Sequence, residues 1–367
     1  MSNPTPVLKA VDPTHVEYEG NIYRFFGGYD YHRLSWNQEI IKAMNHAALI
    51  YGMNSGGSRC TTGNHPLHIE LEQAIARFFG FEDALLLPTG YLANLALFQG
   101  LRKEFDTVFV DEKSHPCIRN GTRVAGLDTH VFPHMNADYI ENEVKKLSKD
   151  KNRFLIVTEG TGSVYSPIVP ADRYMQIADQ YDGMLLVDEA HTAGILGKTG
   201  RGIREYFNLS EDRYLISGTL SKAFGTYGGF ISGARKWIEP VRNSAHVYQC
   251  SSAFPIPLCA AGKKAIEIID NTPEYVVNLQ HMSLKVKTYL RDKGFQLPLT
   301  PTPTIPVLYD NPIHVEKLKI LLKKAGIYPT YIFYPGGPKE GYFRFALSSV
   351  HTWDDIHVFL DCIDKSL

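Results

Sequence analysis

Residues 184–194 read MLLVDEAHTAG, an uninterrupted apolar run that ends at Asp188 and is followed by His191. A strand that is apolar at every position, rather than at every second one, is typical of a parallel sheet covered on both faces. Such sheets bind ligands beyond the carboxyl ends of their strands. The stretch therefore predicts a buried strand that carries Asp188 into a ligand site. The alternative is a capping aspartate and a packed histidine.

Similar short apolar runs recur along the chain, with helical stretches between them. They cover residues 84–87, 108–110, 131–132, 154–157, 214–216 and 230–231. Strands that alternate with helices predict an α/β fold with a mostly parallel sheet flanked by helices. Apolar residues at helical spacing over 67–78, followed by Gly80 as a C-cap, predict one of these helices.

From about residue 255 the pattern changes. It predicts one long helical stretch through residues 266–293, then the segment LPLTPTPTIPVL as an extended entry into a strand, and a short α+β tail. We therefore expect an N-terminal segment (1–31), a large ligand-binding domain (32–265) and a small C-terminal domain (266–367).

Charge and composition argue against several classes of partner. The net charge is -1 and no block of like charges occurs, so we expect no binding to nucleic acid or to an anionic membrane. The chain has no apolar run long enough to span a bilayer and no leader-like start, which predicts a cytoplasmic protein. Its five scattered cysteines form no CxxC pair, so neither a disulfide framework nor a metal site is predicted.

A second chemical motif is SGTLSKAFGTYGG, residues 217–229, in which Lys222 stands alone among small and hydroxylated residues. A lysine in a dry pocket can lose its proton and attack a carbonyl carbon. The hydroxyls of Ser217, Thr219 and Ser221 could donate to a phosphate, while the glycines let the backbone approach it. The alternative is a glycine-rich loop with an incidental lysine.

Further candidates lie upstream. Thr89, Gly90 and Tyr91 follow the run 84–87 and open a helix, whose N-terminal N–H groups could bind a phosphate. His115 could lie over an aromatic ring, although a lone histidine in a loop is more often simply polar. The GKT at 197–199 resembles the end of a P-loop, but the first glycine of that motif would fall at Thr192, so nucleotide hydrolysis is disfavoured.

Five motifs resemble those of one enzyme family, in the same order. They are NSGGSR (54–59), HxxLE (68–72), VTEG with the serine at 163, VDEAHTAGILGKTGRG (187–202) and GTLSKAFG (218–225). Together they are similar to the fold type I enzymes that use pyridoxal 5′-phosphate (PLP), and among these to the α-oxoamine synthases. The resemblance runs from about Phe25 to the C-terminus and implies a seven-stranded sheet.

The resemblance also implies roles around the cofactor. Lys222 would form the Schiff base with PLP, Asp188 would pair with its pyridine nitrogen, and His115 would stack on its ring. Ser163 and His191 would lie by the phenolic oxygen. Thr219 would hold the phosphate beside Thr89, Gly90 and Tyr91.

Two implied contacts concern partners. Ser252, in QCSSAFP, matches a position that reaches the phosphate of a neighbouring subunit, so a homodimer with shared sites is implied. Arg344 matches the arginine that binds the carboxylate of the amino acid substrate, for which a bidentate guanidinium is suited. The substrates implied are an amino acid and an acyl-CoA, which condense to an α-amino ketone with release of CoA and usually CO2.

The chain departs from the family near the substrates. YDYHRL (29–34) replaces a sequence like NDYLGL, so Tyr29 stands in place of an asparagine, and the segment 334–337 is one residue shorter than usual. These departures keep an aminotransferase or a retro-aldol lyase open as alternatives. A non-catalytic partner subunit is disfavoured, because Lys222, Asp188 and Thr219 are all present.

Overall fold

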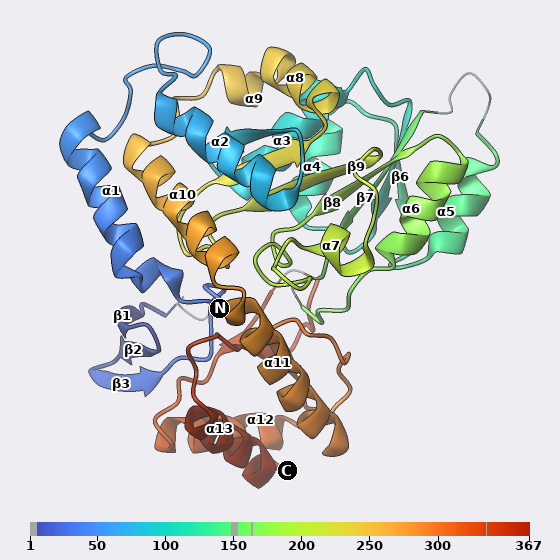
Figure 1. Ribbon diagram of the computed structural model, residues 1–367. Helices are drawn as coiled ribbons and strands as arrows, with labels where there is room; N and C mark the ends of the chain where they lie inside the picture. The colour runs from blue at the N-terminus through green and yellow to red at the C-terminus, as the bar shows by residue number, and fades with distance from the viewer. Residues whose placement is uncertain (1–5, 148–152, 163, 335) are drawn as a thin grey trace.

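A seven-stranded sheet forms the centre of the computed structural model, which describes residues 6–147, 153–162, 164–334 and 336–367 (Figure 1). In spatial order its strands are β4 (Asp83–Leu87), β10 (Gly229–Gly233), β9 (Tyr214–Thr219), β8 (Met184–Asp188), β7 (Phe154–Glu159), β5 (Thr107–Asp111) and β6 (Thr129–Phe132). Strand β10 is antiparallel to both neighbours and the remaining pairs are parallel. All seven apolar runs lie in these strands, and the predicted fold class is confirmed.

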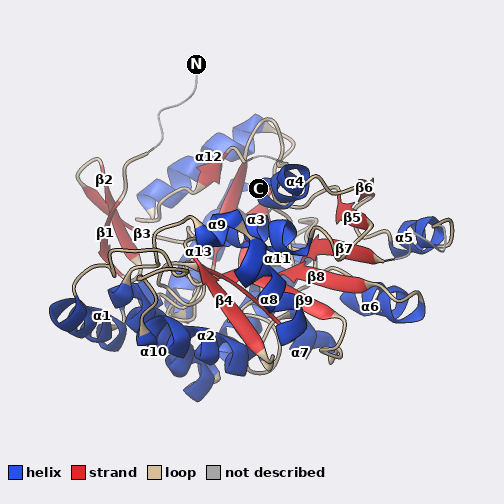
Figure 2. Ribbon diagram, turned by 90° about the horizontal axis from the view of Figure 1, so that it is seen from above, coloured by secondary structure: helices blue, strands red, loops and turns tan. Residues whose placement is uncertain are grey.

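Both faces of the sheet are covered by helices, as Figure 2 shows from above. Successive strand residues alternate between two apolar clusters: Leu185 and Val187 of β8 belong to one, Met184 and Leu186 to the other. The helices of the second cluster are α3 (Gly90–Leu101), α4 (Pro116–Ala125), α8 (Arg235–Ser244) and α9 (His246–Gln249). Those of the first include α2 (Pro66–Phe79), α5 (Ala137–Val144), α6 (Ala171–Gln180), α7 (Ile203–Phe207) and α10 (Ile256–Asn271). This double cover explains the continuous apolar runs.

The strand register brings polar residues together at one edge of the sheet. Glu159, Asp188 and Ser217 lie opposite one another on β7, β8 and β9. Thr219 of β9 pairs with Gly229, which in turn pairs with Leu87 at the end of β4. The carboxyl ends of β4, β7, β8 and β9 therefore meet at the same edge, where ligands of such sheets bind.

The C-terminal part lies beside this edge and below the main sheet in Figure 1. It contains the antiparallel sheet β11 (Thr304–Val307), β13 (Tyr342–Ala346) and β12 (Tyr331–Ile332), with helices α11 (Glu274–Asp292), α12 (Pro312–Lys324) and α13 (Trp353–Ser366). The Pro/Thr-rich segment leads into β11, as predicted. Helix α10 runs across the predicted boundary between residues 265 and 266, and the division into domains stays a prediction.

Two features differ from the sequence prediction. The prediction of a single helical stretch through 266–293 is wrong, because α10 ends at Asn271 and α11 begins at Glu274, with the non-helical Thr272 and then Pro273 between them. The N-terminal residues form a small sheet, β1 (Lys9–Asp12), β2 (His15–Tyr18) and β3 (Asn21–Arg24), whose side chains are mostly not buried and so gave little apolar signal. A 3-10 turn (Leu34–Trp36) and α1 (Gln38–Tyr51) follow.

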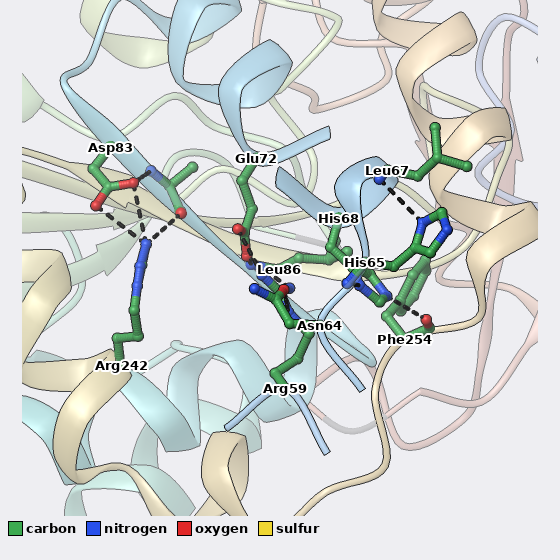
Figure 3. A network of polar contacts seen from close by, with 11 residues as sticks. Arg59, Asn64, His65, Leu67, His68, Glu72, Asp83, Leu86, Arg242 and Phe254 are labelled. Carbon is green, nitrogen blue, oxygen red and sulfur yellow. Dashed lines mark hydrogen bonds and ion pairs between the residues drawn. The ribbon is translucent and has the colours of Figure 1, made fainter. Parts of the chain in front are cut away.

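A buried ion pair anchors the loop 52–65 to the main body (Figure 3). Arg59 donates from Nη1 and Nη2 to the two carboxylate oxygens of Glu72 at 3.0 and 2.9 Å, and both side chains are 6% exposed. Glu72 Oε1 also accepts from the backbone N–H of Leu86 in β4. The loop is therefore fixed to both α2 and the sheet.

The same loop is joined to the segment that carries Ser252. The backbone N–H of Ala253 donates to Gly57 O at 3.0 Å, and Ser58 and Ser252 form an isolated β-bridge. His68 Nε2 donates to Phe254 O at 2.6 Å (Figure 3). Loop 52–65 and the segment 251–254 therefore form one fixed unit. Within the residues described, no helix combines the length and apolarity needed to cross a bilayer.

The paired glutamates of α2 provide a test of the buried ion pair. Glu72→Gln should lower the free energy of unfolding by about 3–5 kcal/mol, because it leaves the Arg59 charge buried without its counter-charge. Glu70→Gln, two residues away, breaks a half-exposed pair with Lys263 and should cost less than about 1 kcal/mol. Urea denaturation measures both, and equal losses would contradict the assignment.

Candidate active site

Lys222 lies in the turn after β9 and is the centre of the candidate site. Its Nζ is 2.9 Å from His191 Nε2. Burial of the amine lowers the pKa of Lys222, although the charges of Asp188 and Glu159 oppose the shift. Arg344 lowers this pKa further. The amine is therefore neutral at a lower pH than that of an exposed lysine.

His191 is held through both ring nitrogens. Its Nε2 contacts Lys222, and its Nδ1 is 2.9 Å from the hydroxyl of the buried Tyr31. Burial and the nearby charge of Lys222 hold the pKa of His191 well below its usual value, so the ring is neutral. Tyr31 was not identified from the sequence, because the segment 29–34 shows only a departure from the family's usual residues.

Asp188, at the end of β8, is oriented by hydrogen bonds to both carboxylate oxygens. Asn94 Nδ2 donates to Oδ2 at 2.7 Å, and the N–H of Ala190 donates to Oδ1 at 2.9 Å. Ser217 Oγ donates to Asn94 Oδ1 at 2.8 Å, which fixes the orientation of that amide. Ser217 was expected to face a phosphate and instead supports Asp188. Asn94 was missed, although a lone asparagine in the apolar helix LANLALF was a usable signal.

His115 lies beside Asp188 at the start of α4. The ring Nδ1 of His115 accepts from the backbone N–H of Cys117. The backbone N–H of His115 donates to Glu159 Oε1 at 3.2 Å. Burial lowers the pKa of His115, so its ring is neutral. Burial and the adjacent Asp188 raise the pKa of Glu159. Glu159 belongs to the VTEG motif but received no role from the sequence.

The start of α3 and the end of β9 meet at the carboxyl edge of the sheet. Thr89 is the N-cap of α3, and Gly90 and Tyr91 supply its first N–H groups. A Cβ on Gly90 would lie 3.2 Å from Gly218 O and from Thr219 Cβ. Because α3 and β9 come this close together at Gly90, a side chain there would push them apart. The Thr219 hydroxyl lies at this junction, accepts from the N–H of Ser221 and donates to Gly228 O.

A cavity of about 540 Å³ opens beside His115 and Glu159. Its wall combines basic, acidic and apolar side chains. The basic ones include Lys113, Arg119 and Arg123, the acidic ones are Asp111, Glu112 and Glu159, and the apolar ones include Val164 and Val169. Tyr334 and Gly336 of the C-terminal part also line it, in the region that departs from the family, whereas Tyr29 is half exposed.

Three predicted site residues remain, on other parts of the chain. Arg344 is in the middle of β13, where Nη1 donates to Gly28 O at 3.3 Å, and its charge also acts on His191. Ser252 belongs to the segment that pairs with Ser58. Ser163 lies outside the described residues.

The chemical groups of this site match the chemical groups of PLP. The cofactor carries an aldehyde, a basic ring nitrogen, a flat ring and a phosphate. The site offers a readily deprotonated amine, an oriented carboxylate, a neutral imidazole and a helix N-terminus with a hydroxyl. The fold and the donor set together define a PLP-dependent enzyme of fold type I.

Comparisons with known proteins agree. Residues 26–363 match the model of the aminotransferase class I and II family. The chain is 34% identical to 8-amino-7-oxononanoate synthase 2 of Bacillus subtilis, over 89% of this chain and 84% of that one. It is 31% identical to serine palmitoyltransferase of Sphingobacterium spiritivorum, over 95% and 88%. A structure of serine palmitoyltransferase from S. paucimobilis with a bound PLP–myriocin aldimine superposes with a TM-score of 0.91 at 26% identity, covering 99% of this chain and 92% of that one.

The chain therefore belongs to the aminotransferase class I and II family and, within it, to the α-oxoamine synthases, which are PLP-dependent acyltransferases. The predicted cofactor is confirmed by this membership. The roles of the individual site residues stay predictions.

Lys222→Ala tests the assignment of the lysine. The variant should lose the visible absorption that a lysine-linked PLP gives, while its far-ultraviolet circular dichroism stays unchanged. Lys198→Ala, which removes an exposed lysine from the neighbouring loop, should keep the absorption. A Lys222→Ala protein with the wild-type spectrum and turnover would show that another amine holds the cofactor.

Proposed function

We propose that the protein condenses an amino acid with an acyl thioester such as acyl-CoA, releasing CoA and usually CO2 and forming an α-amino ketone. The observation that carries the proposal is the cavity beside His115 and Glu159, whose wall combines charged side chains of both signs with apolar ones. An aminotransferase handles two small acids in turn and needs no such space. An acyl thioester with a bulky anionic carrier does.

PLP, when bound, supplies an aldehyde for an amine and a protonated ring that takes up electron density from the α-carbon of an amino acid. Asp188 would accept a hydrogen bond from the N–H of the pyridine ring. The hydrogen bond that Asn94 donates to Asp188 fixes the orientation of this carboxylate. His115 would cover one face of the ring with a neutral imidazole. Thr219 and the first N–H groups of α3 would bind the phosphate.

Lys222 would move the proton of the amino acid α-carbon. A general base works best when its pKa lies near the working pH, and burial brings the pKa of Lys222 down in that direction. His191 stays neutral and holds the amine in place through Nε2, while the Tyr31 hydroxyl fixes the ring from the other side.

Arg344 would bind the carboxylate of the amino acid. A guanidinium offers two parallel N–H donors to a carboxylate, which fixes orientation as well as distance. Arg344 lies close enough to the catalytic groups for its charge to lower the pKa of both Lys222 and His191. A substrate carboxylate at Arg344 would therefore place the α-carbon near the amine.

The cavity would hold the acyl donor. Lys113, Arg119 and Arg123 would bind the phosphates of CoA directly, against the opposing charges of Asp111, Glu112 and Glu159 in the same wall. Val164 and Val169 would contact the acyl chain. The identity of the amino acid and the length of the acyl chain are left open by these contacts.

The same proposal includes a homodimer with shared sites. Loop 52–65 and the Ser252 segment form one fixed unit. The end of α1 exposes Leu49, Ile50 and Tyr51, and the start of the loop exposes Met53 beside them. A second copy covering this apolar surface would bring Ser252 to its neighbour's phosphate. Sedimentation of the holoenzyme would measure whether the protein is a dimer.

A cytoplasmic location is also proposed, supported by the five free cysteines.

The direct test of the function is thiol release. Holoenzyme mixed with single amino acids and acyl-CoA esters should release free thiol in step with amino acid consumption. Amino acid with a 2-oxo acid should give no transamination. Turnover with a 2-oxo acid and no thiol release would instead make the protein an aminotransferase.

Arg344 variants test the carboxylate contact. Arg344→Ala should weaken amino acid binding about tenfold or more, because a charged hydrogen bond contributes about 1.5–3 kcal/mol and each 1.4 kcal/mol is about tenfold. Arg344→Lys keeps the positive charge but loses the two parallel N–H donors. Its affinity for the amino acid should lie between those of the wild type and Arg344→Ala. PLP affinity should not change in either variant. Unaltered amino acid affinity in Arg344→Ala, measured by spectral titration, would remove this role.

A further inference from the structure

Lys287, on α11, is a fully buried lysine without an acidic partner among the residues described. Burial alone lowers its pKa to about 7, and no neighbouring charge contributes to the shift. Burying an amine without a counter-charge is costly, so its hydrogen bonds must satisfy it. The mechanism proposed above does not use this residue.

Four oxygens of the Pro/Thr-rich segment surround the amine. Lys287 Nζ lies within hydrogen-bond distance of Thr300 O and Oγ1, at 3.2 and 2.9 Å, and of Thr302 O and Oγ1, at 2.7 and 2.8 Å, so its three protons are shared among four acceptors. The two threonine hydroxyls are 2.8 Å apart. Because Thr300 Oγ1 accepts from the amine, the proton of this hydroxyl is directed elsewhere.

The proton of Thr300 is directed to the loop that follows β7. Thr300 Oγ1 donates to the backbone carbonyl of Ser166 at 3.1 Å. Ser166 is buried and has a φ of 54°, a left-handed conformation that is uncommon for a residue other than glycine. A conformation of this kind persists only where its surroundings hold it.

Ser166 belongs to a segment that forms one wall of the cavity. We call residues 164–169 the wall segment, of which Val164, Tyr165, Pro167 and Val169 line the cavity. The far end of this segment is fixed by the N–H of Val169, which donates to Gly160 O. Within the chain's own loop, Ser166 Oγ donates to Gly162 O and Ile168 forms a bridge with Thr161. The contact of Thr300 with Ser166 joins this segment to the C-terminal part, so its position there depends on Thr300 and on the amine that orients it.

We propose that Lys287 is a positioning residue for the acyl donor: through Thr300 it fixes the wall segment and so sets how the acyl chain fits the cavity. The inference rests on the proposed function, in which this cavity takes the acyl thioester. It assigns to the C-terminal part a role in acyl selection, in addition to the proposed carboxylate contact of Arg344.

The test compares two lysines on the same helix in the holoenzyme. Lys287→Met keeps the length and the apolar stem but removes every donor, and Lys285→Met makes the same change on the exposed face two residues away. Lys287→Met should raise KM for the acyl-CoA about fivefold or more, the equivalent of about one lost hydrogen bond. It should also change the order of preference among acyl chain lengths. The affinities for amino acid and PLP should stay at the wild-type level, and Lys285→Met should alter none of these.

Thr300 variants separate positioning from folding. Thr300→Val removes the hydroxyl that reaches Ser166 and should raise KM for the acyl-CoA as Lys287→Met does, whereas Thr300→Ser keeps the hydroxyl and should restore the wild-type value. These two variants leave the lysine in place, so they decide the question even if Lys287→Met does not fold.

Binding of CoA alone, measured by calorimetry, distinguishes the two levels of failure. Wild-type protein that binds no CoA and releases no thiol would contradict the proposed function, and this inference with it. Wild-type protein that binds CoA and turns over acyl-CoA, with an unchanged KM and chain-length preference in Lys287→Met and Thr300→Val, would overturn the inference alone. An equal loss of affinity for amino acid and acyl-CoA would also overturn it.

Discussion

The contact of the Lys222 amine with the neutral ring of His191 is the interaction on which the site depends. It requires a crevice dry enough to lower the pKa of the lysine and open enough to admit a cofactor. The sheet provides both conditions, because its apolar strands bury the surroundings while their carboxyl ends deliver Asp188 and Glu159 to the same edge. These two carboxylates also limit the shift, since their charges favour the protonated amine.

The C-terminal part completes this site from the other side. The N-terminal segment runs between the two parts, with the N–H of Ser349 donating to Tyr31 O while the Tyr31 hydroxyl contacts His191. Lys287 acts at a different point, where the Pro/Thr-rich segment meets the loop after β7. The proposed acyl cavity lies where these pieces converge, so substrate selection is expected to depend on contacts between the two parts of the chain.

The sequence predicted what is local and missed what depends on distant partners. The seven strands were predictable because each is a short apolar run, and the chemical motif around Lys222 is continuous in the chain. The break at Pro273 is an exception to this division, because a proline inside a helical pattern is a local signal and was still missed. Tyr31 and Asn94 support the site only because residues about 160 and 94 positions away fold against them. No local pattern shows that Lys287 is buried.

The measurement that tests the central claim most directly is the pH dependence of cofactor capture by Lys222. Protein freed of PLP would be mixed with the cofactor across a range of pH, reduced with borohydride, and the fraction of Lys222 modified read by peptide mass spectrometry. Only the neutral amine attacks an aldehyde, so the initial rate should rise through a midpoint clearly below the 10.5 of an ordinary lysine. A midpoint at or above 10.5, or labelling of another lysine, would contradict the account.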